Sequence, residues 1–287
     1  MSAVVVLRLP VQVDLSGFVA LLRRLQVPHR VSEEAGEQVL WVPGEQLAEQ
    51  VRDLYARYPE GDAAAEMPAI AATHKGEGML ARLWRSPVTA LMLVLTLIAF
   101  GITAAGENFA AIRWLSFVDF RIQGEHIYLT YLDATLASGE WWRLITPMLI
   151  HFGWLHLAMN SLWYWELGRR IEFRQGAVSL LALTLLFSLA SNFAQYWWSG
   201  PSLFGGLSGV LYGLLGHCWL YQRLAPNANY RLPPGVLVMM LAWLLICMTG
   251  IFELLQFGAI ANAAHVGGLL AGCVTGLLGG ALARRHR

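Results

Sequence analysis

The sequence predicts an all-α polytopic membrane protein with six transmembrane helices and a small N-terminal cytoplasmic α+β domain of βαββα order. The first observation is composition: 56% of the 287 residues are hydrophobic and only 14% are charged, whereas soluble domains carry about 25% charged residues. The second is distribution, because just over half of the charged residues precede residue 86 and long uncharged runs follow. The third is the alternating, polar character of the first 60 residues.

Charge and cysteine usage exclude several classes of protein. A net charge of +1 gives no reason to expect a nucleic-acid partner. Cys218, Cys247 and Cys273 stand singly in apolar runs, without disulfide or metal-ligand spacing. The N-terminus has no apolar signal region, so we expect no cleaved signal peptide.

Residues 1–60 predict the cytoplasmic domain. They contain no convergent catalytic set, so we expect a regulatory or interaction domain rather than a separate activity. Residues 61–85, rich in Ala, Gly and Pro, predict a linker, and residues 86–287 predict the membrane domain. The expected elements are a strand at 3–8, a helix at 14–25 with Asp14 as N-cap, strands at 29–31 and 38–42, and a helix at 45–58.

The membrane domain contains six uncharged runs, and a helix needs about 20 residues to cross a bilayer. A segment from Glu107 to Arg143 separates the first two runs. It is aromatic and mixed in charge, which favours a place in the headgroup zone; an ordinary surface loop is the alternative. The six runs are Val88–Gly106, Leu144–Trp165, Ala177–Trp198, Ser199–Gln222, Leu232–Phe252 and Leu254–Ala283.

Arginine and lysine placement predicts the orientation of these runs. Basic residues precede the first run, lie between the second and third and between the fourth and fifth, and follow the sixth. The connections after the third and fifth runs have none. Both termini are therefore expected in the cytoplasm, with Ser208 near the outer half of the membrane.

Polar residues inside the runs point to a site, because such groups are costly in lipid and tend to face a protein interior. Glycines at 205, 209 and 213 form one stripe beside Ser208, and Gly268, Gly272, Gly276 and Gly280 form another beside His265. Small-residue stripes let helices approach closely. We therefore expect docking to bring the Ser208 hydroxyl and the His265 imidazole within hydrogen-bond reach. His156 and Asn160 in the second run share a face, as do Ser191 and Gln195 in the third, whereas His151 points elsewhere.

A serine beside a histidine suggests nucleophilic catalysis. His265, neutral in apolar surroundings, would take the proton from Ser208, which would attack a carbonyl. His156, Asn160 and the Ser208 N–H could hold the oxyanion. No acid lies in any run, so the pair would act without a third member. Taken singly, Ser208 could be a helix cap and His265 a packing residue. Several histidines could also suggest a zinc site, but the sequence has no H-E-x-x-H motif. Val210 breaks the G-x-S-x-G pattern of soluble hydrolases.

Four motifs stand out in order along the membrane domain. Two of them are Gly206-Leu207-Ser208-Gly209 and the run from Ala264 to Gly272, which has the form A-H-x-x-G-x-x-x-G. The others are the run from His151 to Asn160, with the spacing H-x4-H-x3-N, and Trp142-Arg143. Together they resemble the motifs of the rhomboid family of intramembrane serine proteases across roughly residues 86–283, and the N-terminal extension resembles the bacterial GlpG type.

The resemblance implies roles for individual residues. Ser208 would be the nucleophile and His265 the general base. His156, Asn160 and the Gly206-Leu207-Ser208 segment would bind the oxyanion, and Tyr212 would stack on the histidine. Ser191 and Gln195 would bring water. His151, Trp142, Arg143 and Glu172 would support the fold. Glu253–Ala261 would form a mobile cap and the fifth helix a gate.

The resemblance also implies a function. The protein would cleave peptide bonds in or next to transmembrane segments of membrane proteins, through an acyl-enzyme and without metal or cofactor. It would lie in the bacterial inner membrane, with its active site opening toward the periplasm. A non-catalytic rhomboid-like binder or chaperone of membrane segments is one alternative. A transporter is another, although we find no internal repeats or intramembrane charges in the runs.

Overall fold

The computed structural model describes residues 3–61, 83–226, 230–233, 235–254 and 259–285. The chain divides into two compact units, Met1–Gly78 and Met79–Arg287. The boundaries predicted from the sequence at residues 60 and 85 stay predictions, because most of the proposed linker falls on residues 62–82, outside the described residues.

The N-terminal unit has the predicted βαββα order. Its three strands form one antiparallel sheet in the order β1-β3-β2. The two helices bury Phe18, Leu22 and Val51 against Leu40 and Val42 of the central strand. The elements are β1 (Ala3–Pro10), α1 (Ser16–Arg24), β2 (Arg30–Glu34), β3 (Glu37–Pro43) and α2 (Glu45–Arg57).

The predicted N-cap differs in detail. Helix α1 begins at Ser16, and its N-cap residue Leu15 makes no side-chain cap bond. Asp14 lies one residue earlier, where its Oδ1 accepts the Ser16 backbone N–H at 2.8 Å. The carboxylate therefore still satisfies one backbone donor at the helix start.

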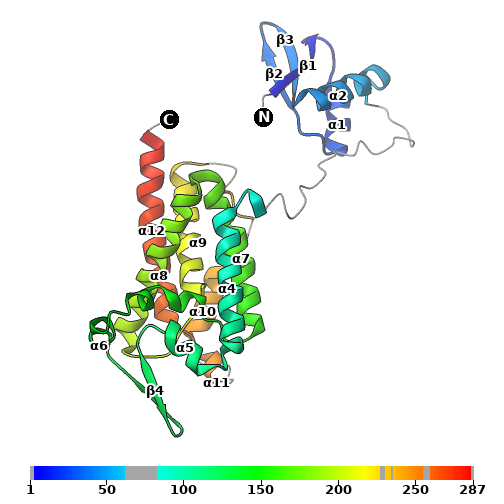
Figure 1. Cartoon of the computed structure of the whole chain (residues 1–287). Coiled ribbons are helices and arrows are strands. Elements are labelled where there is room, and N and C mark those ends of the chain that lie inside the picture. Colours follow the sequence, from blue (N-terminus) through cyan, green and yellow to red (C-terminus); the bar gives the residue numbers. More distant parts are fainter. Residues whose placement is uncertain (1–2, 62–82, 227–229, 234, 255–258, 286–287) are drawn as a thin grey trace. The chain divides into compact units, whose positions relative to one another are not determined.

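The second unit is mostly helical (Figure 1). By length and composition, α8 and α12 could each cross a membrane, whereas α4 and α10 are shorter apolar helices. The count of six spans therefore stays a prediction. The main described helices are α4 (Pro87–Ile102), α7 (Trp154–Gln175), α8 (Ala177–Ser199), α9 (Ser208–Leu224), α10 (Val236–Met248), the short α11 (Ile251–Leu254) and α12 (Asn262–Arg285).

Helix α7 corrects the predicted second run. The chain first forms two 3-10 turns, η2 (Trp141–Leu144) and η3 (Thr146–Leu149), and α7 begins only at Trp154, after Gly153 at φ 87°. It then continues through its charged end to Gln175. His151 therefore precedes the helix. The arginines at 169, 170 and 174, expected in a connection, lie on α7 together with Glu166 and Glu172, beyond the end of the predicted run at Trp165.

Two further boundaries differ from the sequence pattern. The fifth run breaks after Met248, where Gly250 adopts φ 75°, and α12 begins at Asn262 rather than at residue 254. Uncharged sequence alone cannot mark these ends, because the connecting residues are apolar too. The proposed cap, Glu253–Ala261, includes residues 255–258, which lie outside the described residues.

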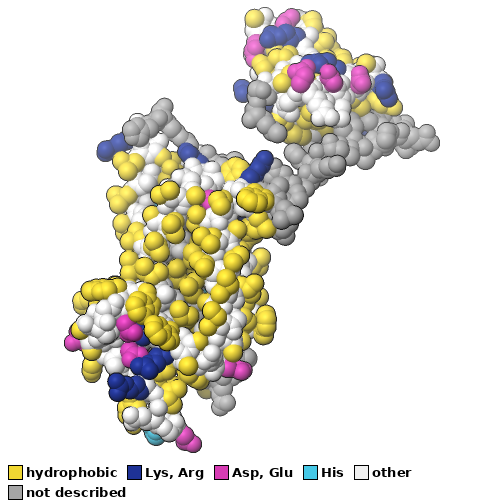
Figure 2. Space-filling model, viewed as in Figure 1, with side chains coloured by type: hydrophobic (Ala, Val, Ile, Leu, Met, Phe, Trp, Pro, Cys, Tyr) yellow, Lys and Arg dark blue, Asp and Glu magenta, His cyan; other side chains and the backbone are white. Residues whose placement is uncertain are grey.

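The surface of the helical unit is apolar over its middle. Figure 2 shows hydrophobic side chains covering the visible face of the helices, with charged side chains toward the two ends. Large side chains are exposed to an extent that water would disfavour, including Val178 at 82% and Trp197 at 90%. Such a continuous apolar surface indicates contact with lipid.

The segment expected in the headgroup zone is folded rather than extended. It follows η1 (Ala104–Gly106) and contains α5 (Phe109–Leu115), the hairpin strands β4 (Phe120–Gln123) and β5 (His126–Leu129), and α6 (Leu132–Ala137). Figure 1 shows these elements gathered at one end of the helical unit, with the hairpin projecting from it. Its depth in a membrane stays a prediction.

Helices α9 and α12 dock through their glycines, as the stripes predicted. A Cβ on Gly268 would lie 2.0 Å from the Gly209 carbonyl oxygen, and one on Gly272 would lie 1.9 Å from that of Gly213. No side chain fits there. Gly205 is the exception to the prediction: it belongs to the loop before α9, where it packs against Ile150.

Candidate active site

Ser208 and His265 meet at the start of the two docked helices. Ser208 is the first residue of α9, and the buried His265 lies in the first turn of α12. The Ser208 Oγ and His265 Nε2 are 2.7 Å apart. His265 Nδ1 has no hydrogen-bond partner among the described residues. With its proton on Nδ1, the imidazole can accept the hydroxyl proton at Nε2.

Tyr212 lies one turn after Ser208 and holds the histidine ring. The ring centroids of Tyr212 and His265 are 5.0 Å apart, with the planes tilted by 42°. The Tyr212 hydroxyl donates to the Met240 carbonyl oxygen at 3.0 Å, which links α9 to α10. The ring contact limits rotation of the imidazole away from Ser208.

His156, in the first turn of α7, presents an N–H toward the loop before Ser208. Its Nδ1 accepts the Phe152 backbone N–H at 3.3 Å, so the ring proton belongs on Nε2. A Cβ on Gly206, which has φ 119°, would lie 2.8 Å from that Nε2. Only glycine leaves this approach open. The buried Asn160 donates from Nδ2 to the His156 carbonyl oxygen at 2.9 Å.

His151 does not point elsewhere, as the helical pattern suggested, because it is not on the helix. Its ring centroid lies 4.9 Å from that of His156. His151 Nδ1 donates to the Leu149 carbonyl oxygen at 3.2 Å, and Nε2 accepts the Leu207 N–H at 3.4 Å. The imidazole thus fastens the loop that carries Ser208.

Backbone donors near Ser208 are not equally available. The Gly206 N–H donates to the Pro147 carbonyl oxygen at 3.0 Å, and the Leu207 N–H is engaged by His151. Ser208, as the first helical residue, has an N–H without an intrahelical acceptor. Of this segment, the Ser208 N–H is therefore the best placed to receive an oxyanion.

A small cavity of about 10 Å³ adjoins Ser208 and is lined by Ser191, Ser188 and Asn192 among others. This is roughly the space that one water needs. Ser191 Oγ is buried and has no partner among the described residues, which suits a water-binding role. Sequence reasoning missed Ser188 and Asn192, although their i, i+4 spacing on α8 is the signal that identified Ser191 and Gln195.

Gln195 is engaged in a different way from Ser191. Its Oε1 accepts the Ala264 N–H at 3.1 Å, and its Nε2 donates to Ser199 Oγ at 3.0 Å. The amide therefore caps the first turn of α12, one residue before His265. This contact positions the helix that carries the imidazole.

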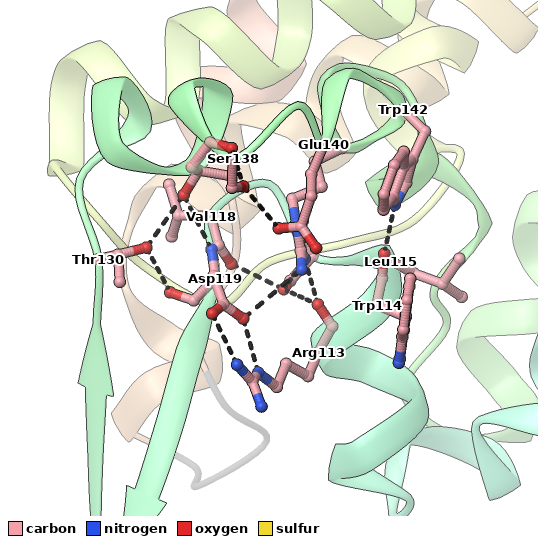
Figure 3. Close-up of polar contacts among 12 residues, drawn as sticks. Arg113, Trp114, Leu115, Val118, Asp119, Thr130, Ser138, Glu140 and Trp142 are labelled. Carbon is pink, nitrogen blue, oxygen red and sulfur yellow. Dashed lines mark hydrogen bonds and ion pairs between the residues drawn. The ribbon is translucent and has the colours of Figure 1, made fainter.

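Arg143 organises the segment between α4 and α7. Only 2% of its side chain is exposed. Its Nε donates to Glu140 at 2.9 Å, and the rest of the guanidinium contacts the Ser116 and Arg113 carbonyl oxygens and Asp119. Figure 3 shows this cluster, in which Arg113 also donates two hydrogen bonds to the Asp119 carboxylate, from Nε to Oδ1 at 2.6 Å and from Nη2 to Oδ2 at 2.8 Å.

Trp142 lies beside this cluster. Its ring stacks on Trp114, with centroids 5.9 Å apart, and its Nε1 donates to the Trp114 carbonyl oxygen at 2.9 Å (Figure 3). Trp142 and Arg143 both lie in the 3-10 turn η2, so their contacts fasten the segment to the start of the chain that leads to His151.

Glu172 joins α7 to the start of α4. Its Oε1 accepts the Val88 N–H at 2.8 Å, and its Oε2 accepts the Thr89 N–H at 2.9 Å and the Thr89 hydroxyl at 2.7 Å. A carboxylate is favoured at a helix N-terminus because the free N–H groups carry partial positive charge. The contacts agree with a structural role.

Within the part of the chain that the structure describes, no group of three or more His, Cys, Asp or Glu side chains is arranged to hold a metal ion. The arrangement around Ser208 can instead support proton transfer from a hydroxyl, with polar N–H donors nearby.

Comparison with known proteins identifies the chain. Residues 138–281 match the rhomboid domain family, and residues 1–69 match the rhomboid N-terminal domain family. One similar solved structure is the solution structure of the N-terminal domain of a rhomboid intramembrane protease from P. aeruginosa. It is 72% identical and covers 24% of this chain and 99% of that chain, with a TM-score of 0.19. The chain belongs to the rhomboid family of membrane-embedded proteins, whose members are generally intramembrane serine proteases.

Proposed function

We propose that this protein is a serine endopeptidase that hydrolyses peptide bonds in or next to transmembrane segments of membrane proteins. The observation that carries the proposal is the 2.7 Å contact between Ser208 Oγ and His265 Nε2, at the point where α9 and α12 dock. A neutral imidazole at this distance is the general base that a serine needs to become nucleophilic.

In the first step, Ser208 Oγ attacks the scissile carbonyl carbon while its proton passes to His265 Nε2. The negative charge that develops on the carbonyl oxygen would be received by the Ser208 N–H, the His156 Nε2–H and the Asn160 amide. As the C–N bond breaks, His265 returns the proton to the leaving amine. The acyl group remains as an ester on Ser208.

Water completes the reaction. A water molecule in the cavity beside Ser191 would lose a proton to His265 and attack the ester carbonyl. As the ester C–O bond breaks, His265 would return that proton to Ser208 Oγ, which releases the acid and restores the hydroxyl. The cavity's size supports this route, as does the Ser191 hydroxyl, which has no hydrogen-bond partner in the part of the chain that the structure describes. Tyr212 and Gln195 would keep the imidazole in place through both steps.

We further propose that α4, α7, α8, α9, α10 and α12 span a bacterial inner membrane, with both termini in the cytoplasm. The arginines at 169, 170 and 174 at the end of α7, and those at 284 and 285 at the end of α12, support this orientation. Ser208 and His265 lie in the first turns of α9 and α12, and would then face the outer side of the membrane. Substrate segments with weakened helices would be favoured, because an intact helix hides its carbonyls.

The test uses the purified protein in lipid vesicles with a fluorescent transmembrane substrate. We expect Ser208→Ala and His265→Ala to lose cleavage, and Ser208→Ala to lose labelling by a fluorophosphonate, while both variants remain folded. Ser202→Ala is the matched control, because Ser202 lies in the same loop and its hydroxyl makes just one long hydrogen bond within the described residues, to the Gly200 carbonyl oxygen at 3.4 Å. Cleavage by Ser208→Ala at the wild-type rate would end the serine mechanism.

The alternative function is a non-catalytic binder of membrane segments. It predicts a wild-type protein that retains substrate but neither cleaves it nor reacts with the fluorophosphonate. The close contact of hydroxyl and imidazole favours the protease, since a binder has no need of either group in this geometry.

A further inference from the structure

A second polar contact joins α9 to α12, far along the helices from Ser208. His217 of α9 and Thr275 of α12 are both helical residues, and the His217 Nδ1 lies 3.0 Å from the Thr275 Oγ1. His217 is only 2% exposed, and the catalytic steps above do not use it. A buried histidine outside the reaction requires its own explanation.

The hydrogen bonds around His217 form one consistent chain of donors. The Thr275 hydroxyl donates to the Gly272 carbonyl oxygen at 3.0 Å, so its oxygen accepts from His217 Nδ1–H. The His217 Nε2 is then an acceptor, 2.7 Å from the Gln175 side-chain nitrogen. Gln175 also donates to the Tyr230 hydroxyl. The Thr275 hydroxyl, the His217 Nδ1–H and the Gln175 amide therefore each have an acceptor, with the imidazole neutral.

This cluster lies on the same pair of helices as the proposed catalytic residues, with nearly the same offset. His217 follows Ser208 by nine residues, and Thr275 follows His265 by ten. At a rise of about 1.5 Å per residue, Ser208 and His217 are separated by roughly 14 Å along α9, and His265 and Thr275 by roughly 15 Å along α12. The helices run parallel, because both bonded pairs occur in the same chain order. A shift of one helix along the other would break both hydrogen bonds together.

The glycine contacts alone do not set this register. Gly213 and Gly272 give a close, smooth contact that is held by dispersion, which has little directionality. A hydrogen bond depends steeply on distance and angle. Among the described residues, the side-chain hydrogen bonds from α9 to α12 are the Ser208–His265 and His217–Thr275 contacts.

We infer that His217 and Thr275 are positioning residues that hold α9 and α12 in the register required by Ser208 and His265. The inference rests on the proposed function. Proton transfer and attack tolerate little displacement, and a misplacement of about 1 Å can cost about a hundredfold in rate. Gln175 anchors this contact to α7, and Tyr230 continues it to the segment before α10.

The experiment compares Thr275→Val with Thr275→Ser in lipid vesicles, with kcat expressed per active site titrated by fluorophosphonate. We expect Thr275→Val, which keeps the shape but removes the acceptor, to lower kcat about fivefold with KM unchanged. Thr275→Ser keeps the hydroxyl and should stay near wild type. His217→Ala should lower kcat at least as much, and its combination with Thr275→Val should be no worse than either alone.

Tyr230→Phe controls for a merely structural effect, because Tyr230 lies on neither helix and bonds only Gln175 within this cluster. It should lower the melting temperature without changing kcat per active site. The inference is overturned if Thr275→Val behaves like Tyr230→Phe, losing only stability. If the wild type cleaves substrate and Thr275→Val keeps the full kcat, the positioning role is rejected but the proposed function is not. If Ser208→Ala cleaves substrate, the proposed function itself is rejected.

Discussion

Gly272 of α12 packs directly on the carbonyl oxygen of Gly213 of α9, where an added Cβ would lie only 1.9 Å away. Both atoms involved are backbone, so no side chain can rotate to make room. The two helices that carry Ser208 and His265 can approach to this distance only because residue 272 is glycine, whereas a Cβ on Gly213 would meet the Phe187 ring of α8 instead. Stability and catalytic geometry therefore depend on the same contact.

Gly272→Ala should separate α9 from α12. We expect a loss of about 1–3 kcal/mol of stability, typical of overpacking, together with loss of fluorophosphonate labelling at Ser208. Gly101→Ala is the control, since a Cβ at Gly101 on α4 meets nothing within 4 Å; it should be neutral or slightly stabilising. Thermal unfolding in detergent measures both, and equal behaviour of the two variants would contradict the prediction.

Glu172→Gln should weaken the joint between α7 and α4. The amide nitrogen of the glutamine would face one of the backbone N–H groups that now donate to the Glu172 carboxylate. At least one hydrogen bond would then be lost, and a buried donor would be left unpaired. We expect a loss of about 2–3 kcal/mol, measured by reversible unfolding in mixed micelles. Glu166→Gln on the same helix removes only partly exposed ion pairs with Arg169 and Arg170, and should cost less than about 1 kcal/mol.

Acid should loosen the segment that contains Asp119. Hydrogen bonds from Arg113 hold the pKa of the Asp119 carboxyl below its ordinary value of 3.8. A lowered pKa in the folded state means that the stabilisation is complete above that value and is lost as the pH falls through the folded pKa.

We expect hydrogen exchange in residues 109–137 to stay constant from about pH 7 down to the ordinary carboxyl pKa of 3.8, and to quicken as the pH falls further through the lowered pKa of folded Asp119, after correction for intrinsic rates. Asp119→Asn should remove this acid dependence and show fast exchange at neutral pH. Asp133→Asn, in the first turn of α6, should retain the wild-type profile. An unchanged acid response in Asp119→Asn would mean that another group is responsible.

His156 and His151 should fail in different ways, although their rings are neighbours. His156→Ala removes a proposed oxyanion donor, and loss of one such donor costs about 10²–10³ in kcat. We expect its melting temperature to change little. His151→Ala removes the acceptor for the buried Leu207 N–H and should lower the melting temperature as well as activity. Paired measurements of kcat and unfolding distinguish the two, and a stable, inactive His151→Ala would reverse this assignment.

Helix periodicity predicted much of the site because it depends on local geometry alone. The spacing of Gly209 and Gly213, and of Gly268 and Gly272, was enough to predict that α9 and α12 dock and that Ser208 meets His265. The same reasoning failed for His151, because two 3-10 turns and Gly153 delay the start of α7. An apolar run does not reveal where a helix begins when its flanking loop is apolar too.

The sequence by itself determined that this chain has an apolar helical part, a βαββα extension and a serine and histidine on glycine-lined helices, since composition and spacing act within one element. Only the tertiary structure decided that the Leu207 N–H donates to His151, that Gln195 caps α12, and that His217 forms a hydrogen bond with Thr275. Those outcomes depend on competition among donors and acceptors from different elements. Such competition is resolved by distances and angles of a fraction of an ångström, which no pattern along the chain encodes.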